Sequence, residues 1–460
     1  MASFLRAPAR LSACLALALN VAQPAAAQSM LRDTETEAFF QDLVAPVVAA
    51  AGLPARNVDV ALLGDRSINA FVAGGQVIYV HAGLIEEADT AAEVQGVLAH
   101  ELGHITGGHI IRQGEGAKAA TNITLLSLLA GIGAALAGAG DAGMAAMLMG
   151  QRAAMGKFLA YSRGEEGSAD AAGAAYLAKA GISGRGSLGF FEKLSGMESR
   201  HAVSRDAEME YVRTHPLTSD RIAALRDTYQ RDAAWQKPDD PAMQARFERI
   251  KAKLTGYLGE PEQTLRVYPR SDTGVPARYA RAYAYHKQAK VGEALAETEA
   301  LIASAPDDPY FLELEGQILL ESGRPADALA VLRKATALTN AQPLIATLYG
   351  HALIATEDRD NFEEAERVLR AAVARDRHNP FAWRQLGTVY AARGDLPRAN
   401  LASAEQQVMS GDYLQAVRSA RNAQAGLAEH SADWLRAQDI EMEARNLLDR
   451  EDKKGRGRRG

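Results

Sequence analysis

Residues 100–104 read His-Glu-Leu-Gly-His and end an apolar run that begins at Val94. Such a run predicts a helix, and two residues four positions apart share one face of a helix. The imidazoles of His100 and His104 can therefore bind one metal ion, while Glu101 beside them can act as a base toward a water molecule. This pattern is typical of zinc hydrolases. The five residues also occur by chance in many proteins as a pair of surface histidines, so the rest of the sequence has to decide.

A catalytic zinc ion needs three protein ligands and one open position, so a further ligand must come from elsewhere in the chain. A histidine six residues after His104 would complete a metzincin site, but Ile110 occupies that position. His109 falls one residue short and is turned away from the face of the two histidines. We therefore interpret His109 as a residue that supports a ligand or ends the helix.

The segment 165–170 contains the best candidate for the third ligand. Glu166 and Asp170 are four residues apart and share a helix face, whereas Glu165 turns aside. We predict that Glu166 binds the zinc ion and that Asp170 accepts a hydrogen bond from a ligand imidazole and fixes its tautomer. The alternative is that the two glutamates are solvated charges near the start of a helix.

His215 is the other candidate, in the segment Thr-His-Pro at residues 214–216. Proline restricts the preceding residue to an extended backbone, so a loop can hold this side chain rigidly. His215 is predicted to be a fourth zinc ligand that occupies the substrate position at rest, or a donor that stabilises the oxyanion. A turn without metal contact is the remaining alternative.

The first residues predict export from the cytoplasm. Two arginines precede the apolar stretch 11–21, and Ala27 ends a run of small residues suited to cleavage, so we expect a signal peptide over residues 1–27. The single cysteine, Cys14, lies within it, so the mature chain would have no disulfide and no thiolate ligand for zinc. A lipid anchor at Cys14 is less favoured, because the apolar stretch follows this residue rather than preceding it.

The composition is that of an ordinary globular protein. The chain has 460 residues, of which 47% are hydrophobic and 23% charged, which is enough for two or three domains. Its net charge of −6 at pH 7 gives no reason to expect nucleic acid as a partner.

Residues 28–236 are predicted to form an α+β zincin-like (gluzincin) metalloprotease domain. Helical spacing over residues 33–51 is followed by three short β-branched runs separated by glycines, which predict a small antiparallel sheet that leads into the metal-binding helix. We expect the last of these runs to be an edge strand against which a substrate segment pairs. The three runs are residues 58–63, 68–72 and 76–80.

Residues 119–140 contain no charged side chain over 22 positions. The length would permit a membrane span, but glycines and alanines leave the segment weakly hydrophobic, and a span would separate the two halves of the metal site. We predict instead that residues 119–150 form a hydrophobic helical hairpin, which packs beside the site or dips into a membrane surface.

The C-terminal half is predicted to be an all-α tetratricopeptide repeat solenoid. Four prolines spaced 33, 34 and 37 residues apart each open a helix, and glycines follow three of them after seven residues. We expect these small residues to face the alanines of the second helix in each unit, because the paired helices then approach closely. The prolines are Pro276, Pro309, Pro343 and Pro380, the glycines Gly316, Gly350 and Gly387, and the alanines Ala294, Ala328, Ala365 and Ala399.

The remaining boundaries follow from composition. Residues 237–275 are expected to be linker helices, residues 276–450 the repeats, and residues 451–460 a basic disordered tail.

These motifs in combination resemble a known family. The chain is similar to the periplasmic beta-barrel assembly-enhancing proteases and, more broadly, to the peptidases that include the prenyl-protein endopeptidases and the heat-shock membrane protease of bacterial inner membranes. One departure is Ser168, where family members often carry an acidic residue; this position is not the ligand. The resemblance rests on residues 68–71, 83–85, 100–104, 166–170 and 214–216 and on the repeats.

The resemblance implies one zinc ion per chain on His100, His104 and Glu166, with Glu101 as the catalytic base. It implies a periplasmic metalloendopeptidase that degrades misfolded or misassembled outer-membrane proteins, with the repeats binding substrates or the beta-barrel assembly machinery. Peripheral membrane contact through residues 119–150 is a further expectation. The alternative function is a chaperone or scaffold whose metal site is silent because His215 occludes it.

Overall fold

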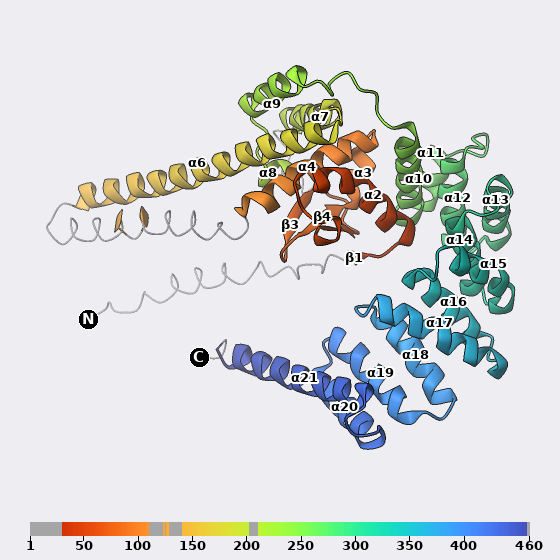
Figure 1. Cartoon of the computed structure of the whole chain (residues 1–460). Helices are drawn as coiled ribbons and strands as arrows, with labels where there is room; N and C mark the ends of the chain where they lie inside the picture. Colours follow the sequence, from red (N-terminus) through yellow and green to blue (C-terminus); the bar gives the residue numbers. More distant parts are fainter. Residues whose placement is uncertain (1–29, 110–122, 125, 128–139, 202–209, 458–460) are drawn as a thin grey trace, which may run out of the picture.

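The structure is a computed structural model that describes residues 30–109, 123–124, 126–127, 140–201 and 210–457. Figure 1 shows an N-terminal body of helices and strands, a long helix that projects from it, and a curved array of helices formed by the C-terminal half. The predicted signal peptide, residues 1–27, and most of the predicted hairpin, residues 119–150, lie outside the described residues.

A four-stranded sheet with the strand order β1-β2-β4-β3 lies in the N-terminal body. β3 and β4 form an antiparallel hairpin, and β1 pairs with β2 in the antiparallel direction, but β2 and β4 run parallel. The prediction of an antiparallel sheet is therefore wrong, and the sheet is mixed. Apolar patterning predicts that a strand exists but does not specify the direction of its neighbour. The strands are β1 (Met30–Leu31), β2 (Asp59–Leu63), β3 (Ala70–Ala73) and β4 (Val77–His81).

β4 is an inner strand, so the prediction that residues 76–80 form an edge is also wrong. β3 occupies that edge, because the chain leaves β2, passes to the outer position and then turns back into β4. Gly74 and Gly75 make this tight turn with φ angles of 62° and 111°, which favour glycine.

Helix α4 (Ala91–Gly107) carries residues 100–104. It begins at a capping motif in which the Thr90 hydroxyl accepts a hydrogen bond from the backbone N–H of Glu93 (3.1 Å). The Glu93 carboxylate in turn accepts one from the backbone N–H of Asp89 (2.7 Å). The helix ends at Gly108, whose φ angle of 64° is the left-handed conformation that commonly terminates helices.

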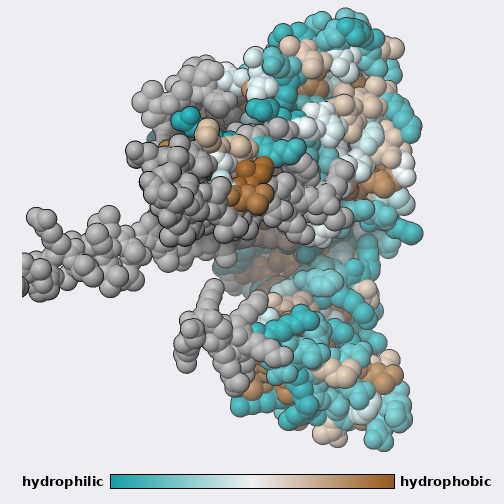
Figure 2. All heavy atoms as spheres, turned by 90° about the vertical axis from the view of Figure 1, so that its left-hand side faces the viewer, coloured by the Kyte–Doolittle hydropathy of each residue, from teal (hydrophilic) through white to brown (hydrophobic). Residues whose placement is uncertain are grey.

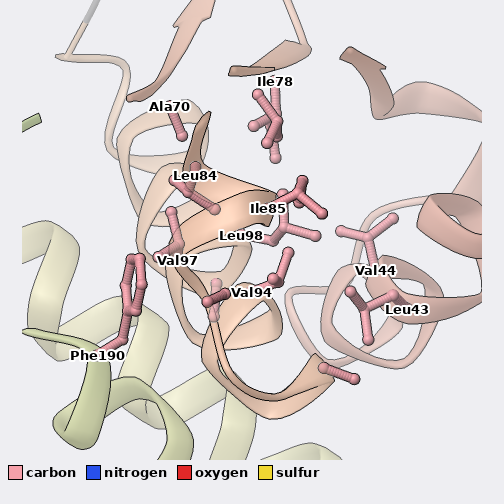
Figure 3. Packing of buried hydrophobic residues seen from close by; sticks show 14 of the residues in the cluster. Leu43, Val44, Ala70, Ile78, Leu84, Ile85, Val94, Val97, Leu98 and Phe190 are labelled. Atoms are coloured by element: carbon pink, nitrogen blue, oxygen red, sulfur yellow. The ribbon is translucent and has the colours of Figure 1, made fainter. Parts of the chain in front are cut away.

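The apolar face of α4 lies at the centre of the body (Figure 3). It packs against α2 (Thr34–Ala50), the sheet and α3 (Ala82–Glu87), while α7 (Arg185–His201) closes the other side. One helix face therefore anchors α4 in the core and leaves the opposite face for the histidines. The labelled buried residues are Leu43, Val44, Ala70, Ile78, Leu84, Ile85, Val94, Val97, Leu98 and Phe190.

The longest helix, α6, projects away from the body over its N-terminal half (Figure 1). Its residues 140–150 belong to the predicted hairpin, and a Cβ atom at Gly150 would collide with the side chain of Ser127, so the two segments touch there. None of the described helices is long and apolar enough to cross a membrane. This region continues with α6 (Gly140–Ala180), α8 (Glu210–Thr214) and α9 (Ser219–Arg231), and a short 3-10 helix η1 (Ala55–Asn57) precedes β2.

The predicted linker contains α10 (Pro241–Leu258) and α11 (Pro261–Val267). Phe247, Ile250 and Leu254 of α10 are buried in the same hydrophobic core as α4. α10 also packs against the first helix of the array, so it is a structural element that joins the two halves rather than a spacer.

Pairs of helices follow up to Gly457. The four predicted prolines lie in the first turn of α12, α14, α16 and α18, which confirms the predicted helix starts. The predicted disordered tail is helical as far as Gly457. The helices are α12 (Val275–Lys287), α13 (Val291–Ser304), α14 (Pro309–Glu321), α15 (Pro325–Leu338), α16 (Pro343–Ala355), η3 (Arg359–Asn361), α17 (Phe362–Arg375), α18 (Pro380–Ala392), α19 (Leu396–Met409), α20 (Tyr413–Gly426) and α21 (Ala432–Gly457).

Two glycines of the array pack against larger side chains than predicted. A Cβ atom at Gly316 would lie 2.4 Å from Leu332, and one at Gly350 would lie 2.6 Å from Leu369. The prediction that small residues face each other is therefore wrong at these two positions. The glycine leaves a hole that a leucine fills, and the alanine predicted for this role lies one turn earlier in the second helix.

A buried network of charges connects the array to the N-terminal body. Lys253 of α10 donates hydrogen bonds to Asp33 (2.5 Å) and Glu35 (3.4 Å), and the Tyr279 hydroxyl of α12 donates to Glu35 (2.7 Å). Arg249 pairs with Glu35 as well. These contacts fix the start of α2 against both α10 and the repeats. The part of the array that faces the viewer in Figure 2 is mostly hydrophilic.

Candidate metal centre

The histidines of α4 lie on one face of the helix, as their spacing predicts. Nε2 of His100 is 3.1 Å from Nε2 of His104, and the two side chains are buried. Both imidazoles therefore present a ring nitrogen to the same point.

Glu166 on α6 lies opposite this pair of nitrogens. Its Oε2 atom is 3.5 Å from Nε2 of His100, and its Oε1 atom is 3.5 Å from Nε2 of His104. The structure thus places the predicted third ligand beside the first two, although 62 positions separate Glu166 from His104 in the chain.

Helices α4 and α6 approach closely because glycine lies at their contact points. A Cβ atom at Gly103 would be 2.5 Å from the backbone oxygen of Ala169, and one at Gly173 would be 2.9 Å from that of Ala99. A larger side chain at either position would push the helices apart and separate the ligands they carry.

Asp170 contacts His100 from the outer side. Its Oδ1 atom lies 2.9 Å from Nδ1 of His100, as predicted for a carboxylate that fixes a tautomer. Arg221 on α9 binds both oxygens of Asp170 (2.7 and 2.8 Å) and also contacts Glu166 (2.9 Å). Arg221 is not among the site residues predicted from the sequence; the only signal for it is that two buried carboxylates require a cation nearby.

His215 completes the group. Its Nδ1 atom lies 3.0 Å from Glu166 Oε1 and 3.4 Å from Nε2 of His100, while its Nε2 atom lies 3.7 Å from Oε1 of Glu101. The imidazole therefore stands between the other ligand candidates and the predicted base.

The short helix α8 holds His215 in this place. The His215 N–H donates to the Tyr211 carbonyl (2.7 Å), and the two rings stack with centroids 4.7 Å apart. The Tyr211 N–H in turn donates to the carbonyl of Ile68, just before β3 (2.9 Å). The histidine is thus attached to the sheet edge.

His109 lies behind His104 rather than in the cluster. The two Nδ1 atoms are 2.9 Å apart, and the Ser168 hydroxyl lies 3.0 Å from Nε2 of His109. This position agrees with the interpretation of His109 as a residue that supports a ligand.

In the absence of a metal ion, the charges of the ligand candidates favour the binding of a cation. Burial opposes the charge on Glu166, but its contacts with His100 and His215 outweigh burial and place its pKa far below the usual range. Burial and the neighbouring histidines lower the pKa of His104 to about 2. For His100, burial is outweighed by the hydrogen bonds to Asp170 and Glu166, which raise the pKa to about 10. The site therefore combines an ionised carboxylate with a neutral imidazole.

These residues fit a zinc ion. One donor atom each from His100, His104, Glu166 and His215 lies within 4.8 Å of the others. Four ligands at the usual zinc distances of about 2.0–2.1 Å stand about 3.3 Å apart at tetrahedral geometry. The separations of 3.1 Å between the two histidines of α4 and 3.5 Å from each to the carboxylate are close to that value.

The cluster opens on a cavity of about 410 Å³. Its walls include three of the ligand candidates (His104, Glu166 and His215), Glu101 and the β3 edge. The Asn69 side chain beside β3 is buried, and its Oδ1 atom has no hydrogen-bond partner among the described residues. A polypeptide could therefore reach the cluster along an edge that still has free polar groups.

A comparison with protein families supports a peptidase site at this cluster. The family model of Peptidase family M48 matches residues 33–229, which contain all four cluster residues and Glu101. Residues 33–229 are an M48 peptidase domain. The M48 domain thus includes the strands β2, β3 and β4, the helices α2 to α8 and most of α9, and it contains the whole cluster.

The similarity to curated proteins extends beyond the M48 domain into the helical array. The beta-barrel assembly-enhancing protease of Yersinia pestis is 27% identical over 384 residues, which cover 82% of this chain and 76% of that protein. The protein of the same name from Escherichia coli K12 is 26% identical over 77% of this chain and 72% of its own length. Among solved structures, the crystal structure of MamA covers 37% of this chain and 96% of its own, at 18% identity and a TM-score of 0.28.

Proposed function

We propose that this chain is a zinc-dependent metalloendopeptidase that degrades misfolded or misassembled outer-membrane proteins in the periplasm. The observation that carries the proposal is the buried cluster of His100, His104, Glu166 and His215 beside the carboxylate of Glu101. The M48 domain supports a peptidase, and the names of the relatives support substrates among outer-membrane proteins.

His100, His104 and Glu166 would hold one zinc ion per chain, and His215 would be a fourth ligand at rest. A zinc ion in this site supplies a Lewis acid for the scissile carbonyl and lowers the pKa of water to about 7. The protein contributes the rigid placement of the three ligands, because the α4–α6 contact at Gly103 leaves little room for movement.

Glu101 would take a proton from water and transfer it to the leaving amine. Its side chain is 1% exposed, and its Oε1 atom has no hydrogen-bond partner among the described residues. Burial raises the pKa of this carboxyl group, which brings it closer to the pH at which a base must both accept and release a proton.

The outer edge of β3 is the proposed place for the substrate backbone. β3 pairs only with β4 among the described strands, and its residues Phe71 and Val72 line the cavity. An extended segment that adds to this edge would be bound mainly through its main chain, which suits unfolded proteins more than one fixed sequence.

The proposed location and partners rest on other parts of the chain. The predicted signal peptide supports the periplasm, and the helical array is proposed to bind substrates or the beta-barrel assembly machinery. On α6, Met144, Leu148 and Met149 are exposed, which supports peripheral membrane contact in this region.

A second candidate function is a chaperone or scaffold with a silent metal site. The position of His215 favours it, because this imidazole contacts Glu166 and faces Glu101 at the same time. A permanently bound His215 would deny the substrate access to both residues.

One experiment separates the two functions. The mature chain, purified with its metal, is assayed for metal content and for cleavage of casein and of an unfolded outer-membrane β-barrel protein, with and without a chelator. For the peptidase we expect one zinc ion per chain and cleavage that the chelator stops. Glu101→Gln should reduce cleavage by about 10²–10⁴-fold without loss of zinc, whereas the control Glu192→Gln, at an exposed glutamate of α7, should leave cleavage unchanged. Cleavage that survives either the chelator or Glu101→Gln would refute the mechanism, and zinc without any cleavage would favour the scaffold.

A further inference from the structure

We infer that a directional chain of hydrogen bonds through His109 and Ser168 positions His104 as a ligand. The inference rests on the proposed function in one respect, namely that the cluster binds a metal ion. It assigns a positioning role to two residues on opposite sides of the α4–α6 contact, neither of which belongs to the cluster itself.

The end of α4 places His109 behind His104. Gly108 adopts the left-handed conformation that ends the helix, so the next residue turns back along the helix rather than continuing it. A Cβ atom at Gly107 would lie 2.3 Å from Nε2 of His109, so the imidazole lies directly over this glycine. His109 is 4% exposed. Two consecutive glycines thus make room for a buried ring.

The direction of each hydrogen bond follows from the first. Nε2 of His104 points into the cluster, so it must carry the lone pair, and the proton of the neutral ring is on Nδ1. This Nδ1–H donates to Nδ1 of His109 at 2.9 Å. His109 must then carry its own proton on Nε2, from which it donates to the Ser168 hydroxyl at 3.0 Å. The hydroxyl donates to the carbonyl of Glu165 at 2.9 Å.

This chain of hydrogen bonds ends on the backbone of α6, the helix that carries the predicted third ligand, Glu166. Glu165 directly precedes Glu166, so the hydrogen bonds tie a ligand of α4 to the ligand of α6. Each donor in the chain has one acceptor. Because the Ser168 hydroxyl donates its proton to the Glu165 carbonyl, it accepts from Nε2–H of His109; the neutral His109 ring then has its lone pair on Nδ1, which the Nδ1–H tautomer of His104 satisfies.

The two histidines of α4 are therefore supported in different ways. His100 contacts the carboxylate of Asp170, whereas His104 contacts a neutral imidazole. Partners of this outer kind typically change metal affinity by about 10–100-fold when they are removed. We expect a loss in this range at His109 and a smaller one at Ser168, because Ser168 is exposed and water can replace its hydroxyl.

The test is the zinc dissociation constant of the full mature chain, measured by competition with a chromogenic chelator. His109→Ala should weaken zinc binding by about 10–100-fold, Ser168→Ala by less, and His109→Gln should restore part of the affinity because its amide oxygen can accept from His104. His378→Ala is the matched control, since this histidine is exposed in the array. The melting temperature of the metal-free variants reports whether they fold.

Each outcome bears on one claim. Zinc affinity in His109→Ala within about twofold of wild type would overturn the inference, as would an equal loss in the control. If metal-free His109→Ala does not fold, the other two variants decide. Unchanged zinc affinity in Ser168→Ala, together with no zinc binding in folded His109→Gln, would also overturn the inference. A wild-type chain that binds no zinc would instead refute the proposed function.

Discussion

The Nε2 atom of His215 lies 3.7 Å from Oε1 of Glu101. Nδ1 of the same ring lies 3.0 Å from Glu166, so one imidazole contacts a ligand candidate on one side and the candidate base on the other. A substrate carbonyl that is to reach Glu101 must take the place of this ring. We therefore propose that the loop of His215 controls access to the site.

Replacing His215 tests this control of access. His215→Ala should increase cleavage of casein, by several-fold to about tenfold, because the free energy of displacing the ring, about 1.4 kcal/mol for a factor of ten, is no longer required. Initial rates at saturating zinc measure the effect. Thr228→Ala, at an exposed threonine of α9, is the control. A loss of cleavage would show instead that His215 assists the reaction, as expected for an oxyanion donor.

Zinc affinity should depend on pH through His100. Asp170 and Glu166 outweigh the effect of burial and raise the pKa of His100 to about 10 in the metal-free protein, so this ring carries a proton at pH 7. A zinc ligand must be neutral, so binding has to release that proton. Affinity should therefore rise about tenfold per pH unit between pH 7 and 9. Calorimetry in buffers of different ionisation enthalpy should show about one proton released, and no release would contradict the assignment.

The candidate ligands were predictable from the sequence because they follow helical spacing. His100 and His104, and likewise Glu166 and Asp170, are four residues apart on two helices. These two pairs of residues come together only because α4 and α6 are in contact at Gly103, and the sequence alone does not show that this glycine lies at a contact. A glycine within a helix does not reveal which backbone approaches it.

Arg221 and the pairing of β4 were not predictable for a related reason. Arg221 lies in an amphipathic helix, where an arginine is ordinarily a solvated side chain; here its partners are the buried carboxylates of Glu166 and Asp170 and the Pro216 carbonyl. β4 alternates in the same way whether its neighbour runs parallel or antiparallel. Both features depend on residues distant in sequence.

The contact at Gly103 gives a prediction on stability. Gly103→Ala should lower the free energy of unfolding by about 1–3 kcal/mol, because the new methyl group would lie 2.5 Å from the backbone of Ala169. It should weaken zinc binding too, since α4 and α6 carry different ligands. Gly164→Ala on α6 is the control: a Cβ atom there meets nothing within 4 Å, so the helix should gain up to about 1 kcal/mol. Chemical denaturation of the metal-free chains measures both, and equal effects would contradict the role of Gly103.

Glu313, in the second half of the chain, should make the stability of the folded protein depend on pH. This carboxyl group on α14 lines a cavity of about 250 Å³ between the M48 domain and the repeats, and its Oε2 atom has no hydrogen-bond partner among the described residues. Burial raises its pKa to about 8, above its ordinary value of 4.5. The folded state therefore holds a proton that the unfolded state has lost, so this contribution to stability is complete below pH 4.5 and decreases as the pH rises through 8.

Glu313→Gln should remove this dependence. The amide is neutral at every pH, so the variant should have a higher melting temperature than wild type at pH 8 and a similar one near pH 5. Thermal unfolding at several pH values measures the difference between the two proteins. Glu363→Gln, an exposed glutamate of α17, should follow the wild type throughout. If the difference between Glu313→Gln and wild type does not grow with pH, Glu313 is already ionised in the folded protein, and a counter-charge must stabilise it within the cavity.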